Sequence, residues 1–104
     1  MGPGHIIVGA EGYIASCNEA AGDILGFPAY TAPGFKLVEL IARNAETDLF
    51  LDVVHEPFVR PPFFRSASVF IYRRPIHVVC RGIHIAPARL SVSIALVRLD
   101  VITG

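Results

Sequence analysis

The stretch that most constrains the fold of this chain runs from Gly12 to Phe27 and reads GYIASCNEAAGDILGF. It has the pattern of a short strand that leads into a helix with a defined start and a defined end. Asn18 is of a residue type that accepts hydrogen bonds from the free N–H groups of a first helical turn. Gly26 suits the left-handed residue that ends many helices, and Pro28 prevents the helix from continuing. The sequence therefore predicts a helix from residue 18 to about residue 25.

Further elements are predicted on both sides of this stretch. A first strand is expected from His5 to Val8. From Phe35 to Val54 apolar residues recur near helical spacing, with charged residues between them, which predicts two short helices that break near Asn44. Helical structure is expected to end at the next proline, where an extended crossover follows that contains Pro57, Phe58, Pro61, Pro62, Phe63 and Phe64.

The last third of the chain is rich in Val, Ile, Tyr and Phe and is predicted to form strands. We expect three of them, at about Ala67–Arg73, Ile76–Ala86 and Leu90–Val101, with turns at Arg74-Pro75 and Pro87-Ala88-Arg89. Two strands, a cluster of short helices and three more strands make an α+β fold. The alternation of strands and helices that builds a parallel doubly wound sheet is not present.

This order of elements resembles the PAS family of sensory input domains. The resemblance rests on a glycine turn before the second strand and on an Asn followed by paired alanines, and the matching residues are Gly12, Ile14, Asn18, Ala20, Ala21, Gly26 and Phe27. Two segments depart from the family pattern: Arg73-Arg74-Pro75 replaces a common Asp-Gly turn, and Asp100-Val-Ile-Thr103 is one residue longer than the usual ending.

The resemblance covers nearly the whole chain and implies a PAS-like five-stranded antiparallel sheet with short helices packed on one face. The final strand is then expected to lie centrally, beside the first. It also implies a single sensor domain over residues 1–104, excised from a longer signalling protein such as a histidine kinase or a transcription regulator.

The two faces of the predicted sheet are assigned by arginines. Side chains alternate along a strand, and a charged arginine in mid-strand should point away from the helices, as Arg81 and Arg98 are expected to do. The inner face then carries mostly small residues: Val78, Cys80, Gly82, His84, Ser91, Ser93, Ala95 and Val97. The outer face is mainly apolar and carries His77, Val79, Ile83, Val92, Ile94 and Leu96.

Small inner residues leave room for a cavity, which is the usual ligand site in the PAS family. The candidate pocket residues are Val78, Cys80, Ser91, Ser93 and Phe50, with the two serines offering hydroxyls to a ligand. The alternative is a solid core in which the cavity is filled by Phe50, Phe58, Phe63 and Phe64. The residues leave both alternatives open.

Two functions follow from these alternatives. The first is a sensory module that binds a small molecule between sheet and helices and passes the change to an attached output domain through its C-terminal strand. The second is a ligand-free interaction module that works through the outer sheet face. In both cases a homodimer is expected through Val79, Ile83, Val92, Ile94 and Leu96, because apolar surface of this extent favours a partner.

Specific cofactors find little support. The Asn-Cys-Arg motif of flavin photoreceptor PAS domains is absent, because Ser16-Cys17-Asn18 has the reverse order. The candidate haem ligand is His55, but a lone histidine near a helix end more often interacts with the helix dipole. A metal site is disfavoured because Cys80 and His84, on one strand face, lie about 13 Å apart. No grouping has the spacing of a catalytic site, so no enzyme activity is predicted.

Charge and composition exclude other classes. Residues 1–56 carry eight acidic and two basic residues, a net charge of −6, and residues 57–104 carry seven arginines and one acid, a net charge of +6. These arginines are spread along strands, so nucleic-acid binding is not expected. No apolar run approaches the roughly 20 residues that span a bilayer and no signal peptide pattern is present, which predicts a cytoplasmic protein with two reduced cysteines, Cys17 and Cys80.

Overall fold

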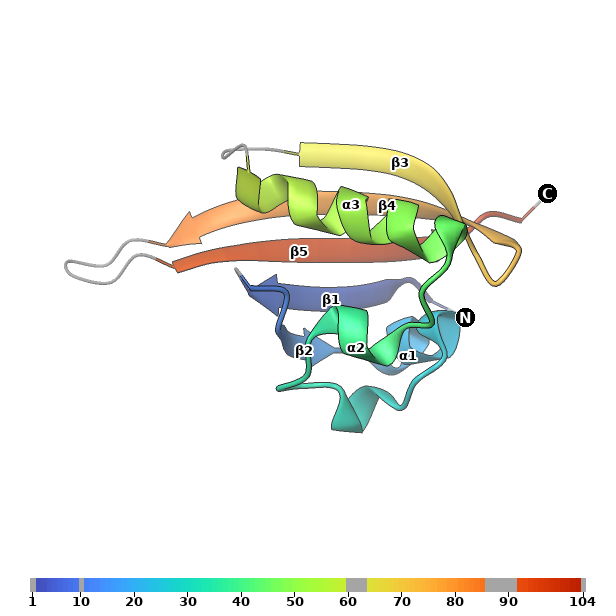
Figure 1. The fold of residues 1–104 in the computed structure, drawn as a ribbon, viewed down its shortest axis with the longest axis horizontal. Helices are drawn as coiled ribbons and strands as arrows, with labels where there is room; N and C mark the ends of the chain where they lie inside the picture. Colours follow the sequence, from blue (N-terminus) through green and yellow to red (C-terminus); the bar gives the residue numbers. More distant parts are fainter. Residues whose placement is uncertain (1, 10, 60–63, 86–91, 104) are drawn as a thin grey trace.

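A five-stranded antiparallel sheet with helices on one face forms the fold (Figure 1). The computed structural model describes residues 2–9, 11–59, 64–85 and 92–103. The strands are arranged in the order β2-β1-β5-β4-β3, so the last strand lies centrally beside the first, as predicted. The elements are β1 Gly4–Gly9, β2 Ile14–Cys17, α1 Glu19–Leu25, the short 3-10 helix η1 Ala29–Thr31, α2 Leu37–Leu40, α3 Ala45–Val59, β3 Phe64–Ile71, β4 Arg74–Ile85 and β5 Val92–Val101.

The cap of α1 has the form that the sequence predicts. Asn18 Oδ1 accepts a hydrogen bond from the backbone N–H of Ala21 at 3.0 Å, and Gly26 ends the helix with a φ of 86°. The same Asn18 side chain also accepts from the N–H of His5 at 2.8 Å and donates to the carbonyl of Pro3 at 3.0 Å. One side chain therefore caps the helix and fixes it to the start of β1.

The break between α2 and α3 lies near Asn44, as expected, but α3 is longer than predicted. It continues through Pro57 to Val59, where the sequence predicted an extended crossover, so Phe58 lies in the helix. Proline lacks an N–H and disturbs the carbonyl four residues earlier, but in the last turn this removes only one helical hydrogen bond. Phe50 and Val53 are buried in the core, and this burial holds the earlier turns of α3 in place. The other crossover prolines lie outside the described residues.

The turn between β3 and β4 differs from the prediction. It is formed by Tyr72 and Arg73, both in the left-handed region with φ of 50° and 64°, whereas Arg74 and Pro75 are the first residues of β4. A two-residue loop with positive φ at both positions matches the right-handed twist of the flanking strands. The predicted turn at residues 87–89 lies outside the described residues.

Hydrogen bonds to two helices hold this unusual turn. Tyr72 Oη donates to the carbonyl of Leu25, at the end of α1, at 2.8 Å. The N–H of Arg73 donates to Glu46 Oε2, in the first turn of α3, at 3.3 Å. Contacts with both helices therefore replace the glycine or asparagine that such a turn usually requires.

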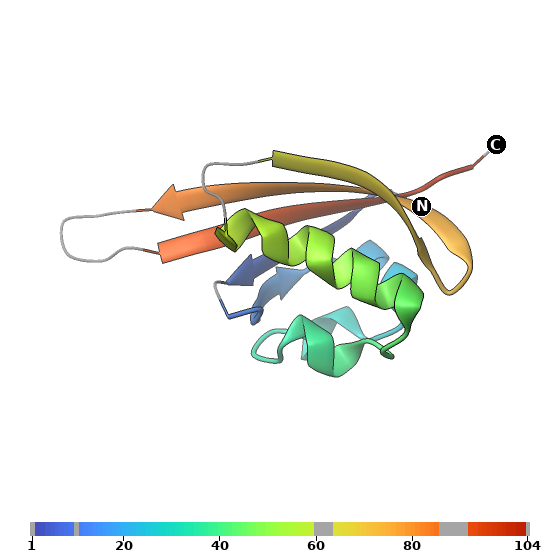
Figure 2. The same ribbon diagram turned by 45° about the horizontal axis from the view of Figure 1, so that its top comes forward.

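The inner and outer faces of β4 and β5 agree with the assignment that was made from Arg81 and Arg98. Val78, Cys80, Ala95, Val97 and Leu99 are buried on the inner face. Arg81 and Arg98 are exposed on the outer face. Figure 2 shows α3 lying along the inner face, where it contacts β3, β4 and β5, while α1 contacts β1. The core lies between these helices and the sheet.

Candidate functional site

A hollow of about 270 Å³ opens in the helical layer, between α2, α3 and the turn that joins β1 to β2. Apolar side chains form its floor: Val8 of β1 and Val54 of α3 are buried, and Leu51 of α3 is partly buried. Val38 of α2 closes one side and is 38% exposed. The hollow therefore offers apolar surface that is open to solvent.

Polar side chains surround this floor. Glu11 comes from the turn after β1, Arg43 from the segment between α2 and α3, and Asp52 and His55 from α3. The guanidinium of Arg43 is held by Asp48, with an Nε–Oδ1 distance of 2.6 Å. The rim thus carries both signs of charge, so a polar group of either sign has a complementary side chain nearby.

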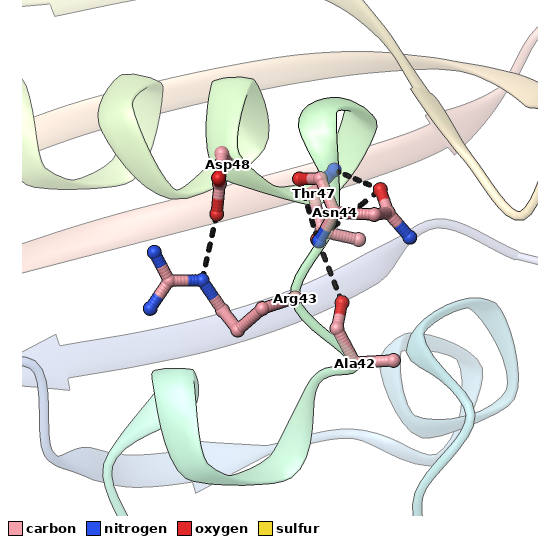
Figure 3. A network of polar contacts seen from close by, with 5 residues as sticks. All are labelled: Ala42, Arg43, Asn44, Thr47 and Asp48. Atoms are coloured by element: carbon pink, nitrogen blue, oxygen red, sulfur yellow. Dashed lines mark hydrogen bonds and ion pairs between the residues drawn. The ribbon is translucent and has the colours of Figure 1, made fainter.

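A compact hydrogen-bond network fixes the corner between α2 and α3 (Figure 3). Thr47 is fully buried, and its Oγ1 donates to the carbonyl of Ala42 at 2.7 Å and accepts from the N–H of Asn44 at 3.0 Å. In return, Asn44 Oδ1 accepts from the N–H of Thr47 at 3.0 Å. The start of α3 is therefore capped reciprocally, and this positions the residues of α3 that line the hollow.

Comparison with known proteins identifies the architecture. No family model and no curated protein matches the chain. Solved structures do match it, and one is the PAS domain of the histidine kinase ThkA, with a TM-score of 0.73, 15% identity, and 96% of this chain and 99% of that chain covered. The chain has the PAS fold.

Other solved structures agree. The PAS domain of BvgS from Bordetella pertussis matches with a TM-score of 0.64 and 22% identity over 97% of this chain and 77% of that chain. A sensory box sensor histidine kinase from Vibrio cholerae matches with a TM-score of 0.67 and 15% identity over 99% of this chain and 85% of that chain. The predicted PAS architecture is therefore confirmed over nearly the whole chain.

Three of the five predicted pocket residues are buried in the core of this PAS fold and do not line the hollow. Phe50, Val78 and Cys80 are all fully buried in the core. Cys80 Sγ lies 3.8 Å from the carbonyl oxygen of Val54, so α3 rests directly on β4 at this point. Ser91 lies outside the described residues, as does the side chain of Ser93. A role of these five residues in ligand binding stays a prediction.

Most residues of the hollow were not predicted from the sequence. Leu51 and His55 are four residues apart and so share one side of α3, which helical spacing alone indicates. From the sequence, His55 is a candidate haem ligand or a helix-end residue that interacts with the helix dipole. Glu11 and Val38 join the same hollow through the packing of a turn and of α2 against α3, which no local pattern reveals.

Further features of the described residues concern metal ligands, long apolar helices, thiols and the outer sheet face. No cluster of three or more metal-ligating side chains is present among them, and none of their helices is long and apolar enough to cross a membrane. Cys17 is partly buried, which raises the pKa of its thiol, and Cys80 is fully buried. Of the residues expected to form a dimer interface, Val79, Ile83, Ile94 and Leu96 are partly exposed, and the side chain of Val92 lies outside the described set. The homodimer stays a prediction.

Proposed function

We propose that this PAS-fold domain is a non-catalytic sensory input module. A small molecule binds in the hollow between α2, α3 and β1, and the change passes to an attached output domain through β5. The observation that carries the proposal is the hollow itself, with its apolar floor and polar rim. Ligand sites in proteins combine apolar lining with a few polar groups in this way.

The size of the hollow indicates the size of the ligand. Its volume of about 270 Å³ is slightly below the range of about 300–1,000 Å³ that drug-sized ligands occupy. A small metabolite with an apolar body therefore fits on Val8, Leu51 and Val54. Its polar group then faces Asp52 and the Arg43–Asp48 ion pair at the rim.

The topology provides a route from the hollow to the centre of the sheet. Two elements that line the hollow, β1 and α3, both contact β5, which is the central strand. Beyond the helices, β5 pairs with the start of β4, where Val101 lies opposite Ile76 and the N–H of Ile102 donates to the carbonyl of Pro75. A ligand that binds more tightly when α3 is in one position than in another shifts the equilibrium between two arrangements of the β4–β5 pair. The size of the shift is set by the difference between its binding free energies for the two arrangements.

A thermal-shift screen with a panel of small metabolites tests the binding step. A ligand present at 100 times its Kd stabilises the folded state by about 2.7 kcal/mol, which for a domain of this size raises Tm by about 10 °C or more. The Leu51→Trp variant fills the hollow and should lose this shift. Leu49, which is 50% exposed on the same helix and does not line the hollow, provides the matched control Leu49→Trp.

Comparison of the two variants shows whether a stabilising compound binds in the hollow. The proposal requires a compound that stabilises the wild type and Leu49→Trp but not Leu51→Trp. A compound that stabilises all three equally binds elsewhere, and a panel without any stabilising compound contradicts ligand binding in the hollow. Melting of each variant without ligand shows that both are folded.

The second candidate function is an interaction module that works through the outer sheet face. It is favoured by Val79, Ile83, Ile94 and Leu96, which form apolar surface on the face opposite the helices. Filling the hollow with Leu51→Trp leaves this function intact, which separates it from the first.

A further inference from the structure

The two edges of the sheet differ in how they are protected against pairing with another strand. At one edge, β2 has only 4 residues, and the backbone of Ile14 is already bonded: its N–H donates to Phe35 and its carbonyl accepts from Gly34, both at 2.9 Å. At the other edge, β3 has 8 residues and pairs with β4 in an unbroken register. It contains no proline and no lysine, and Arg65 is its one charged residue. The usual protection of an edge by short length, bulges, prolines or charges is therefore weak in β3.

The register of β3 shows which of its backbone groups point away from β4. Ile71 and Arg74 flank the two-residue turn, so they exchange the first hydrogen bonds of the β3–β4 pair. Because antiparallel pairing alternates, the N–H and C=O groups of every second residue before Ile71 point outward. These residues are Phe70, Ser68, Ser66 and Phe64. Their outward groups have no backbone partner within the described part of the chain.

The edge of β3 is open to another strand. α3 contacts β3, β4 and β5, so it lies across the inner face of the sheet and not beyond β3 (Figure 2). Ser66 and Ser68 are exposed, and so are Phe64 and Phe70, by 60% and 54%. Two large aromatic side chains therefore lie exposed on the same side of the strand, one at each end of the outward row.

We propose that β3 pairs antiparallel with β3 of a second copy of this chain, about a two-fold axis at Ala67. The two sheets then join edge to edge into one continuous sheet. Main-chain hydrogen bonds give such strand addition its affinity, and the side chains that meet across the new pair give it specificity. The contact uses neither the hollow nor the outer sheet face, so it is independent of both candidate functions.

The side chains favour a second copy because this register is self-complementary. Phe64 lies opposite the partner's Phe70, and symmetry repeats this pair at the other end of the strand. Aromatic pairs across two strands stabilise a sheet. Ser66 lies opposite the partner's Ser68, so small side chains separate the two aromatic pairs.

Charge and register agree with the same arrangement. The four outward residues are uncharged, and Arg65 lies opposite the partner's Val69, so no like charges oppose each other across the new pair. A register shifted by two residues places Phe64 opposite the partner's Ser68, or beyond the end of the partner's β3, and loses both aromatic pairs. The aromatic pairs therefore select the register that is centred on Ala67.

Sedimentation velocity of the protein at concentrations up to about 1 mM tests the proposal. The Ser68→Pro variant removes an outward N–H, and proline is tolerated on an edge strand where that N–H faces solvent. The matched control Ser68→Ala keeps the N–H and loses only the hydroxyl. We expect the wild type and Ser68→Ala to dimerise alike. Ser68→Pro removes two hydrogen bonds from the symmetric pair and should raise the Kd of the dimer by at least about tenfold.

Two further variants locate the contact and its register. Leu96→Asp changes the outer sheet face and should leave the dimer intact. The Cα atoms of Ala67 and the partner's Ala67 lie about 4.5 Å apart in the proposed register, within the range of a disulfide. Ala67→Cys in a Cys17→Ser background should therefore form a cross-linked dimer when oxidised glutathione is added.

Thermal melts show that each variant is folded. A protein that stays monomeric up to about 1 mM overturns the proposal, as does a dimer that Ser68→Pro leaves unchanged. A dimer that Leu96→Asp dissociates uses the outer face and also overturns it. An Ala67→Cys variant that forms no cross-link contradicts the pairing about Ala67.

Discussion

The buried hydroxyl of Thr47 should contribute measurably to the stability of the domain. Its Oγ1 donates to the carbonyl of Ala42 at 2.7 Å and accepts from the N–H of Asn44 at 3.0 Å, and the side chain is fully buried. Valine has nearly the same shape but makes neither hydrogen bond. Each lost hydrogen bond costs about 1 kcal/mol, so Thr47→Val should lower the free energy of unfolding by about 2 kcal/mol. For a domain of this length, that lowers Tm by about 8–16 °C.

The matched control is Thr47→Ser, which keeps the hydroxyl and removes one methyl group. Burial of a methyl group contributes about 0.8 kcal/mol, so this variant should lose less than half as much stability as Thr47→Val. Urea unfolding followed by circular dichroism measures both values at the same pH. If Thr47→Val proves as stable as the wild type, or more stable than Thr47→Ser, the network of Figure 3 does not hold the corner between α2 and α3.

Two further predictions concern α1 and the strand before it. Gly26 has a φ of 86°, and a Cβ there would lie 3.1 Å from Tyr72 Oη, so Gly26→Ala should cost about 1–2 kcal/mol in urea unfolding, and an unchanged midpoint would contradict the left-handed cap. Burial raises the pKa of Cys17, so its thiol ionises at lower pH in the unfolded chain than in the folded one. The protonated Cys17 thiol therefore contributes stability that is fully present below the pKa of the thiol in the unfolded chain. This contribution is lost as pH rises from about 8.5 through the higher pKa of the thiol in the folded chain. Cys17→Ser should therefore lose less stability than the wild type over this range, and parallel pH profiles would refute the assignment.

Local patterns in the sequence were sufficient for much of the fold. The cap of α1 depends on Asn18 and Gly26, whose preferences act within a few residues of the chain. The faces of β4 and β5 followed from Arg81 and Arg98, because burial of an unpaired charge costs more than any packing gain there. Both features have short-range causes, and this makes them visible in a single sequence.

The features that were not predicted depend on contacts between distant segments. The left-handed turn at Tyr72 and Arg73 is held by Leu25 and Glu46, which lie far away in the sequence. The passage of α3 through Pro57 depends on burial of the earlier part of the helix against the sheet. The hollow likewise forms only where a turn and two helices meet, so individual lining residues give no local signal.

Native mass spectrometry of the wild type and of Leu51→Trp tests the central claim most directly. The protein is sprayed from a nondenaturing buffer with the compound that gives the largest thermal shift, and its mass is compared with that of the denatured chain. The account predicts one bound molecule on the wild type and on Leu49→Trp, and none on Leu51→Trp. Bare protein in all three samples, or equal binding to all three, would contradict a ligand site in the hollow between α2, α3 and β1.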